Sequence, residues 1–190
     1  MCERKSDVFA NEIELIQSED LRDFVKFYLD TYPPVYFWEI GASSSGKYHP
    51  AMSQGKGGLV RHTKAVCLFL EEILRMSTYA YMKDEYKDFA RIACICHDTI
   101  KYGKSAEINK DEYKFHARFA AIAVDLAWNE FFGQPAPFLL TNAIASHMGQ
   151  WSTERDDRPF TQIDRAVHLA DYMASRPFID IPSLCEDKGE

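Results

Sequence analysis

The chain has 190 residues, of which 46% are hydrophobic and 27% are charged, and its formal net charge at neutral pH is −7. This composition is typical of one globular domain that can bury a sizeable core, and no apolar stretch is long enough to predict a membrane span. The acidic balance and the lack of a long basic run argue against broad electrostatic binding to duplex nucleic acid. The charge does not exclude a small phosphorylated substrate or one strand end, because those need only local positive charge, and a homo-oligomer is left open.

The N-terminal segment MCERKSDVFANEIELIQSED is charged and mixed, without the apolar core of a signal peptide. We therefore expect a cytoplasmic protein. The five cysteines agree with this expectation, because their number is odd and their spacing is scattered. Cys94 and Cys96 lie just before His97, but no second cysteine pair completes a zinc cluster, so we interpret both as buried helix residues. The cysteines are Cys2, Cys67, Cys94, Cys96 and Cys185.

The first strongly periodic segment predicts a helix that begins after Ser18, a good N-cap residue, and ends before Pro33. Residues 35–58 follow as a long irregular stretch rich in Gly, Ser and Lys. Its aromatic residues suggest that it packs onto the domain, and loops of this length are often functional. The one strand signal in the sequence is a short pair near Val35 to Trp38.

Five more segments have the periodicity of amphipathic helices. Gly103 is interpreted as the stop of the second of them and Gly133 as the stop of the third. The sequence therefore predicts an all-α, single-domain fold of about six or seven helices. The five segments span residues 59–76, 84–102, 110–132, 136–147 and 161–176.

Five of the six histidines fall on, or at the end of, segments predicted as helices. A single histidine on such an apolar face is usually a buried core residue, so none of them indicates a site alone. The six are His49, His62, His97, His116, His147 and His168.

The adjacent pair His97-Asp98 carries more information. Neighbouring helix residues point about 100° apart, so both reach one ion only if it lies off the helix end or over one edge. Imidazole and carboxylate together suit Zn, Fe or Mn, and a carboxylate can bridge two ions. A buried carboxylate needs a cation or strong hydrogen-bond donors. A metal or Lys101 would supply the cation, and the spacing leaves both readings open.

Five segments occur in the order and with the spacing of the HD superfamily of metal-dependent phosphohydrolases, which the chain resembles over residues 46–176. The segment KYHPAMSQGKGGLVRHT is most similar to the HD domain of bacterial 3′-to-5′ exoribonucleases. HLADYMASRPF also resembles small HD enzymes that cleave diadenosine tetraphosphate. The five segments are GGLVRHT, CHDTIKYG, KFHARFAA, AIASHMGQW and AVHLADYMASR.

The resemblance implies a single-domain HD-type helical bundle. Residues 1–45 would form an N-terminal helix and a lead-in loop packed on the core. Residues 46–176 would form the hydrolase core, and residues 177–190 a C-terminal tail. With about 45 residues before the match, a separate nucleic-acid-binding domain is not expected, so long RNA is a less favoured substrate than a nucleotide.

The resemblance also implies a metal site with one or two divalent ions, whether Fe, Mn, Zn, Ni or Mg. In members with two ions, Asp98 bridges them. The residues that match the first ion's ligands are His62, His97, Asp98 and Asp171, and those that match the second ion's further ligands are His116 and His147.

Asp98 and Lys101 are assigned catalytic roles by the same resemblance. Asp98 would orient the attacking water, and Lys101 matches a lysine common in the family that would steady the phosphate oxygens. The alternative for Lys101 is a solvated cation at a helix end. The candidates for substrate binding are His49, Lys104, Arg118 and Arg176, although helical arginines are more often surface residues.

Three rings near these residues keep two interpretations each. His168 lies three residues before Asp171 on a similar helix face. It would either contact a metal ligand or simply pack in the core. Trp151 and Phe160 follow His147, and either would stack on a base or anchor the loop.

We therefore expect a metal-dependent phosphohydrolase or phosphodiesterase that hydrolyses a nucleotide or short oligonucleotide phosphoester through metal-activated water. One alternative is a nucleotide-sensing module without turnover. Another is a one-metal nucleotidase, although the glutamate motif of that branch is not found. The substrate, the native metal, the oligomeric state and a lid role for residues 41–58 are left open.

Overall fold

In the computed structural model, which describes residues 4–43, 49–103, 113–152 and 157–184, the chain is all-helical, as predicted. Within these ranges there is no β-strand, and one isolated bridge joins Lys101 to Gly103. None of the described helices combines the length and the apolar character that a membrane crossing requires. The α-helices are α1 (Ala10–Glu14), α2 (Glu19–Thr31), α3 (Val35–Glu39), α4 (Gly58–Arg75), α5 (Asp84–Cys96), α6 (His116–Phe132), α7 (Phe138–Ala145) and α8 (Gln162–Ala174).

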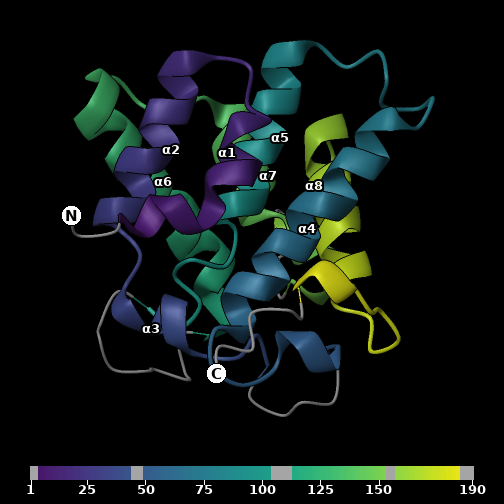
Figure 1. Cartoon of the computed structure of the whole chain (residues 1–190). Coiled ribbons are helices and arrows are strands. Elements are labelled where there is room, and N and C mark those ends of the chain that lie inside the picture. The colour runs from purple at the N-terminus through teal and green to yellow at the C-terminus, as the bar shows by residue number, and fades with distance from the viewer. Residues whose placement is uncertain (1–3, 44–48, 104–112, 153–156, 185–190) are drawn as a thin grey trace.

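The helices pack around one core (Figure 1). α4 lies beside α8, and α2 lies beside α6 on the opposite flank. α5 and α7 are central, because α5 packs against α4, α7 and α8. The N-terminal segment joins the same core through Phe9 and Ile13, which are fully buried.

The segment Val35 to Trp38 is helical, so the strand signal there was wrong. Its β-favouring residues form α3 instead, because Tyr36 and Phe37 are buried against the domain. The ring of Phe37 stacks on Phe9 at 6.4 Å between centroids. α1 and α3 have only five residues each, too few to show a helical period, and they account for the excess over the predicted six or seven helices.

The helix α5 ends at Cys96, several residues before Gly103. The hydroxyl of Thr99 donates to the carbonyl oxygen of Cys96 at 2.8 Å and lies 2.6 Å from the hydroxyl of Tyr28. These contacts satisfy the helix end and place the residues after Cys96 in a turn. The predicted stop at Gly103 was therefore wrong, and His97-Asp98 lies off the helix end.

Two glycines position the start of α4. Gly57 has a left-handed φ of 69°, which costs glycine no steric strain. A Cβ at Gly58 would collide with the carbonyl group of Ser53. Arg61 then fastens the preceding loop, because its Nε donates to the carbonyl oxygen of Met52 at 2.6 Å. Part of the loop whose lid role the sequence leaves open, residues 44–48, lies outside the described residues.

Candidate metal centre

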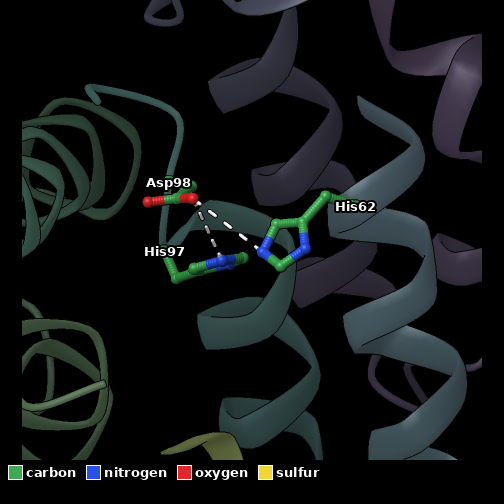
Figure 2. Close-up of side chains that lie close together, drawn as sticks. All are labelled: His62, His97 and Asp98. Carbon is green, nitrogen blue, oxygen red and sulfur yellow. Dashed lines mark ion pairs between the residues drawn. The ribbon is translucent and has the colours of Figure 1, made fainter. Parts of the chain in front are cut away.

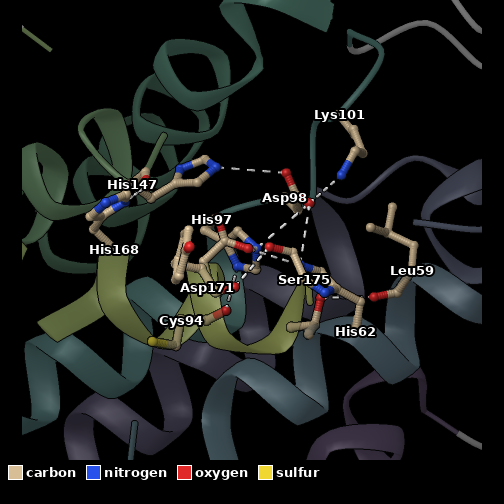
Figure 3. A network of polar contacts seen from close by, with 12 residues as sticks. Leu59, His62, Cys94, His97, Asp98, Lys101, His147, His168, Asp171 and Ser175 are labelled. Carbon is tan, nitrogen blue, oxygen red and sulfur yellow. Dashed lines mark hydrogen bonds and ion pairs between the residues drawn. The ribbon is translucent and has the colours of Figure 1, made fainter. Parts of the chain in front are cut away.

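Six side chains, carried by α4, α6, α8 and the turns that follow α5 and α7, meet in the middle of the domain. Figure 2 shows His62, His97 and Asp98, and Figure 3 adds His147 and Asp171. α4 supplies one from its first half, the ends of α5 and α7 supply three, and α6 and α8 supply one each. All are buried except the one from α8, Asp171, whose side chain is 19% exposed. They are His62, His97, Asp98, His116, His147 and Asp171, the six predicted ligands.

Asp98 lies at the centre of this group, and its two oxygens face different neighbours. Oδ2 lies 3.9 Å from Nε2 of His62 and 3.6 Å from Nε2 of His97 (Figure 2). Oδ1 lies 3.2 Å from Nε2 of His116 and 3.8 Å from Nε2 of His147. One carboxylate is therefore shared by two sets of imidazoles.

Asp171 completes the first set from α8. Its Oδ1 lies 3.1 Å from Nε2 of His62 and 3.9 Å from Nε2 of His97. Ligand atoms that bind one ion at about 2.1 Å stand about 3.0–3.4 Å apart. Most of the observed separations are somewhat longer than this range. The ligand atoms of three triplets lie close enough together to hold an ion: His62, His97 and Asp98; His97, His147 and Asp171; and Asp98, His116 and His147.

The backbone fixes the ring tautomer of three histidines. His97, His116 and His147 each place Nδ1 against the carbonyl oxygen of the residue three positions earlier. A carbonyl oxygen can only accept, so Nδ1 carries the proton and Nε2 presents its lone pair to the site. The acceptors are Cys94 at 2.8 Å, Tyr113 at 2.5 Å and Ile144 at 2.7 Å.

The presented lone pairs need a cation. Nε2 of His116 and Nε2 of His147 face each other at 3.2 Å. Burial lowers the pKa of His147 to about 3, and the neighbouring rings of His97 and His116 add to the effect. The His147 ring is therefore neutral at physiological pH. Nε2 of His97 and Oδ1 of Asp98 are buried without a hydrogen-bond partner among the described residues. A buried atom of this kind is costly, and a divalent metal is the group that this donor set fits.

Lys101 contacts the same carboxylate from the other side. Its Nζ lies 2.5 Å from Oδ2 of Asp98, and the side chain is buried, so it is not a solvated helix-end cation. Burial disfavours charge on both groups, but Asp98 raises the pKa of Lys101 and Lys101 holds the pKa of Asp98 well below its usual range. The pair is therefore ionised. Lys101 therefore supplies a cation to Oδ2, as one of the two readings expected, and it leaves room for the metal reading because Oδ1 faces imidazoles.

A cavity of about 760 Å³ opens onto these residues. This volume is typical of sites for nucleotide-sized ligands. Its wall contains both cations and aromatic rings beside the candidate ligands. The lining residues are Ala42, Ser43, His49, Asp98, Lys101, Tyr102, Tyr113, His116, His147, Met148, Trp151, Asp171, Ser175 and Arg176.

The structure separates the predicted substrate-binding residues. His49 and Arg176 line the cavity. The ring of His49 lies 5.1 Å from that of His62, and burial lowers the pKa of His49 to about 3, so it is neutral. Arg118 does not line the cavity, is 44% exposed and donates from Nε to Asp157 at 2.6 Å. Lys104 lies outside the described residues.

His168 is a partner of a candidate ligand. Its Nδ1 donates to the backbone carbonyl oxygen of His147 at 2.7 Å (Figure 3). Gly149, with a left-handed φ of 57°, leaves the room that this ring occupies, because a Cβ there would collide with it. His168 and Gly149 together hold the segment that carries His147.

Tyr113 was missed by the sequence analysis. Its carbonyl oxygen accepts from His116, its ring stacks on the same imidazole at 5.1 Å between centroids, and Nζ of Lys101 lies 5.9 Å from the ring centre. In the sequence, its place three residues before His116 could have predicted the carbonyl contact, but this place does not favour a tyrosine over any other side chain.

One comparison with known proteins found a match. The family model described as HD domain matches residues 59–176, more than half of the chain. This range contains all six residues of the centre. No curated protein and no solved structure gives a significant match.

Proposed function

This chain belongs to the HD domain family, and we propose that it is a metal-dependent phosphohydrolase that acts on a phosphoester of a nucleotide or a short oligonucleotide. The observation that carries the proposal is the carboxylate of Asp98. It is shared by two sets of imidazoles, three of which have their Nε2 lone pairs fixed towards the site.

The two sets divide the centre into two candidate ion sites. Divalent ions held there would neutralise phosphate charge and lower the pKa of a bound water towards neutrality. Asp98 belongs to both sets, so its loss would dismantle the whole centre. We assign His62, His97, Asp98 and Asp171 to the first ion, and Asp98, His116 and His147 to the second.

Lys101 has two tasks in this proposal. Its ammonium keeps Asp98 ionised, which a metal ligand must be. An ammonium carries three N–H donors, and Lys101 also lines the cavity, so the others are available for a phosphate oxygen. Arg176 and neutral His49 lie on the same wall and supply further polar contacts to a substrate.

The substrate class follows from the cavity and from the sequence resemblance. A cavity of about 760 Å³ suits a nucleotide or the end of a short strand. Diadenosine-type nucleotides and short oligonucleotides, the substrates of the two groups that the sequence resembles, are both included in the proposal.

Metal stoichiometry combined with turnover tests the proposal. The protein is purified without chelator or histidine tag, loaded with Mn²⁺, and examined by elemental analysis and by hydrolysis of bis(p-nitrophenyl) phosphate. We expect about two ions per chain and turnover in the wild type, and neither in Asp98→Ala.

The matched control is Asp84→Ala, which removes an exposed carboxylate at the other end of α5. It should retain ions and turnover. Full metal content and turnover in Asp98→Ala, or no metal in the wild type, would overturn the proposal. About one ion would assign His116 and His147 to substrate or proton transfer, as in a one-metal nucleotidase.

A further inference from the structure

Trp151 presents its indole ring to the cavity. Trp151 is the last residue of the short 3₁₀ turn Gly149–Trp151, and it is 48% exposed. It lines the same cavity as Asp98 and Asp171. The chain's other tryptophans, Trp38 and Trp128, do not line it, and Trp128 is buried.

The plane of the Trp151 ring is fixed by α8. The ring of Tyr172, next to Asp171, is stacked with the indole at 5.5 Å between centroids and 12° between planes. The guanidinium of Arg176 lies 4.2 Å from the centre of the Tyr172 ring and 5.9 Å from that of Trp151. The orientation of Arg176 is itself fixed, because its Nε donates to the carbonyl oxygen of Tyr172 at 3.0 Å.

The second aromatic candidate after His147 has a different environment. Phe160 is 57% exposed but does not line the cavity, and its ring lies 6.3 Å from that of Phe138. Two exposed rings that the sequence could not distinguish are thus separated by the structure, and only Trp151 shares a cavity with the metal centre.

A rigid, half-exposed indole beside a phosphate-type site suits a flat aromatic group joined to a phosphate. A ring already held in place loses little conformational entropy on binding, and bases stack on aromatic side chains with little dependence on their identity. The neighbouring guanidinium would add attraction to the ring faces.

We infer that Trp151 is the base-stacking platform of this site, so that the preferred ligand is a nucleoside phosphate whose phosphate lies at the metal centre. The inference rests on the proposed function for the position of the phosphate. It assigns to Trp151 a specificity role that is separate from the metal ligands.

Binding measurements with and without the base test this role. The Mn²⁺-loaded protein is titrated by calorimetry with AMP and with ribose 5-phosphate, which differ by the base alone. We expect AMP to bind about tenfold more tightly than ribose 5-phosphate. Trp151→Ala should remove this difference and leave the affinity for ribose 5-phosphate unchanged, whereas Trp151→Phe should retain most of it.

Two controls separate stacking from general damage. Phe160→Ala removes an equally exposed ring outside the cavity and should keep the full preference for AMP. Tryptophan emission should be quenched by AMP in the wild type and much less in Trp151→Phe, although that variant still binds. Equal affinity of the wild type for AMP and ribose 5-phosphate, or an unchanged preference in Trp151→Ala, would overturn the inference.

The result can be read separately from the proposed function. If the protein binds Mn²⁺ and hydrolyses bis(p-nitrophenyl) phosphate but shows no preference for AMP, only the stacking role fails. If it prefers AMP through Trp151 but has no turnover, the stacking role holds and the hydrolase proposal fails. Titration with the dinucleotide pApA distinguishes the source of the base, since a strand end predicts tighter binding of pApA than of AMP.

Discussion

Two buried carboxylates, Asp88 within α5 and Asp98 just past its end, have different surroundings. Asp88, in the first half of α5, accepts from the backbone N–H groups of Gln17 and Ser18 and from Nη1 of Arg91, at 2.9–3.1 Å. Asp98, just past the end of α5, has Lys101 as its close donor, while its Oδ1 faces imidazole nitrogens and has no hydrogen-bond partner among the described residues.

The comparison shows how to distinguish a structural from a functional buried charge. Burying a carboxylate is costly, and full hydrogen bonding offsets the cost. At Asp88 the protein supplies every donor, so the carboxylate serves to join α2 to α5. At Asp98 the protein places acceptors around one oxygen, so the stabilising partner must come from outside. The predictions below test this difference.

The largest expected effect is on turnover. Asp98→Asn should lower hydrolysis of bis(p-nitrophenyl) phosphate by about a thousandfold, because the shared anionic ligand is lost. Asp88→Asn should leave turnover within about twofold but lower the free energy of unfolding by about 3 kcal/mol, because it breaks a buried ion pair. Steady-state kinetics and urea unfolding measure the two. The comparison fails if Asp88→Asn loses activity while it remains folded.

The second effect is on metal-linked stability. A ligand that binds only the folded state stabilises it by about 4 kcal/mol at a thousand times its Kd. Adding Mn²⁺ should therefore raise the free energy of unfolding of the wild type and of Asp88→Asn by this amount, and that of Asp98→Asn hardly at all. Urea unfolding in Mn²⁺ and in EDTA gives the difference. An equal gain in Asp98→Asn would show that the ion binds elsewhere.

The sequence predicted which residues come together better than it predicted where the helices around them end. Helices with a strong 3.6-residue period were found, and the order of the motifs selected six residues that the structure brings together, while their role as metal ligands stays a prediction. The end of α5 was missed because Gly103 looked like a stop, whereas the hydroxyl of Thr99 ends the helix earlier. Short α3 has too little periodicity to be found.

Backbone partners were outside the reach of the sequence. The tautomers of His97, His116 and His147 depend on main-chain carbonyl groups, which every residue carries. The role of His168 likewise depends on the carbonyl group of His147. The burial of Lys101 depends on how residues 101–103 fold back, which involves the distant hydroxyl of Tyr36.

A third prediction weakens one set of ligands only. His168→Leu replaces the imidazole with an apolar side chain of similar size and removes the donor to the carbonyl oxygen of His147. Loss of such a supporting contact lowers metal affinity by about 10–100-fold. In a Mn²⁺ titration, one of two binding steps should weaken by this factor while the other is unchanged. If both steps weaken equally, His168 supports the fold and not the second set.

A fourth prediction concerns the turn after Asp98. The hydroxyl of Tyr36 donates to the carbonyl oxygen of Gly103 at 2.6 Å and accepts from the N–H of Tyr102 at 2.9 Å. Tyr36→Phe leaves both backbone groups without this partner, and it should lower the free energy of unfolding by about 2 kcal/mol. Urea unfolding in EDTA measures this loss. A change below about 0.5 kcal/mol, the usual size for a surface substitution, would show that the turn is held by other contacts.

The smallest effect on the free energy of unfolding is expected at Ser18, the residue that precedes α2. Ser18 is the N-cap residue of α2, but its side chain accepts no capping hydrogen bond. The two residues that precede α2, Gln17 and Ser18, donate their backbone N–H groups to the carboxylate of Asp88, from another helix. An N-cap Ser→Ala change typically costs about 1 kcal/mol because the capping bond is lost.

Ser18→Ala should therefore cost less than about 0.5 kcal/mol in urea unfolding. Thr161→Ala is the matched comparison, because the side chain of Thr161 does accept from the N–H of Asp164, at 3.1 Å, at the start of α8. It should cost about 1 kcal/mol. Equal costs for Ser18 and Thr161 in the wild type would mean that the hydroxyl of Ser18 caps α2 in solution, so that the contacts of Asp88 with Gln17 and Ser18 would not be the main support of this helix start.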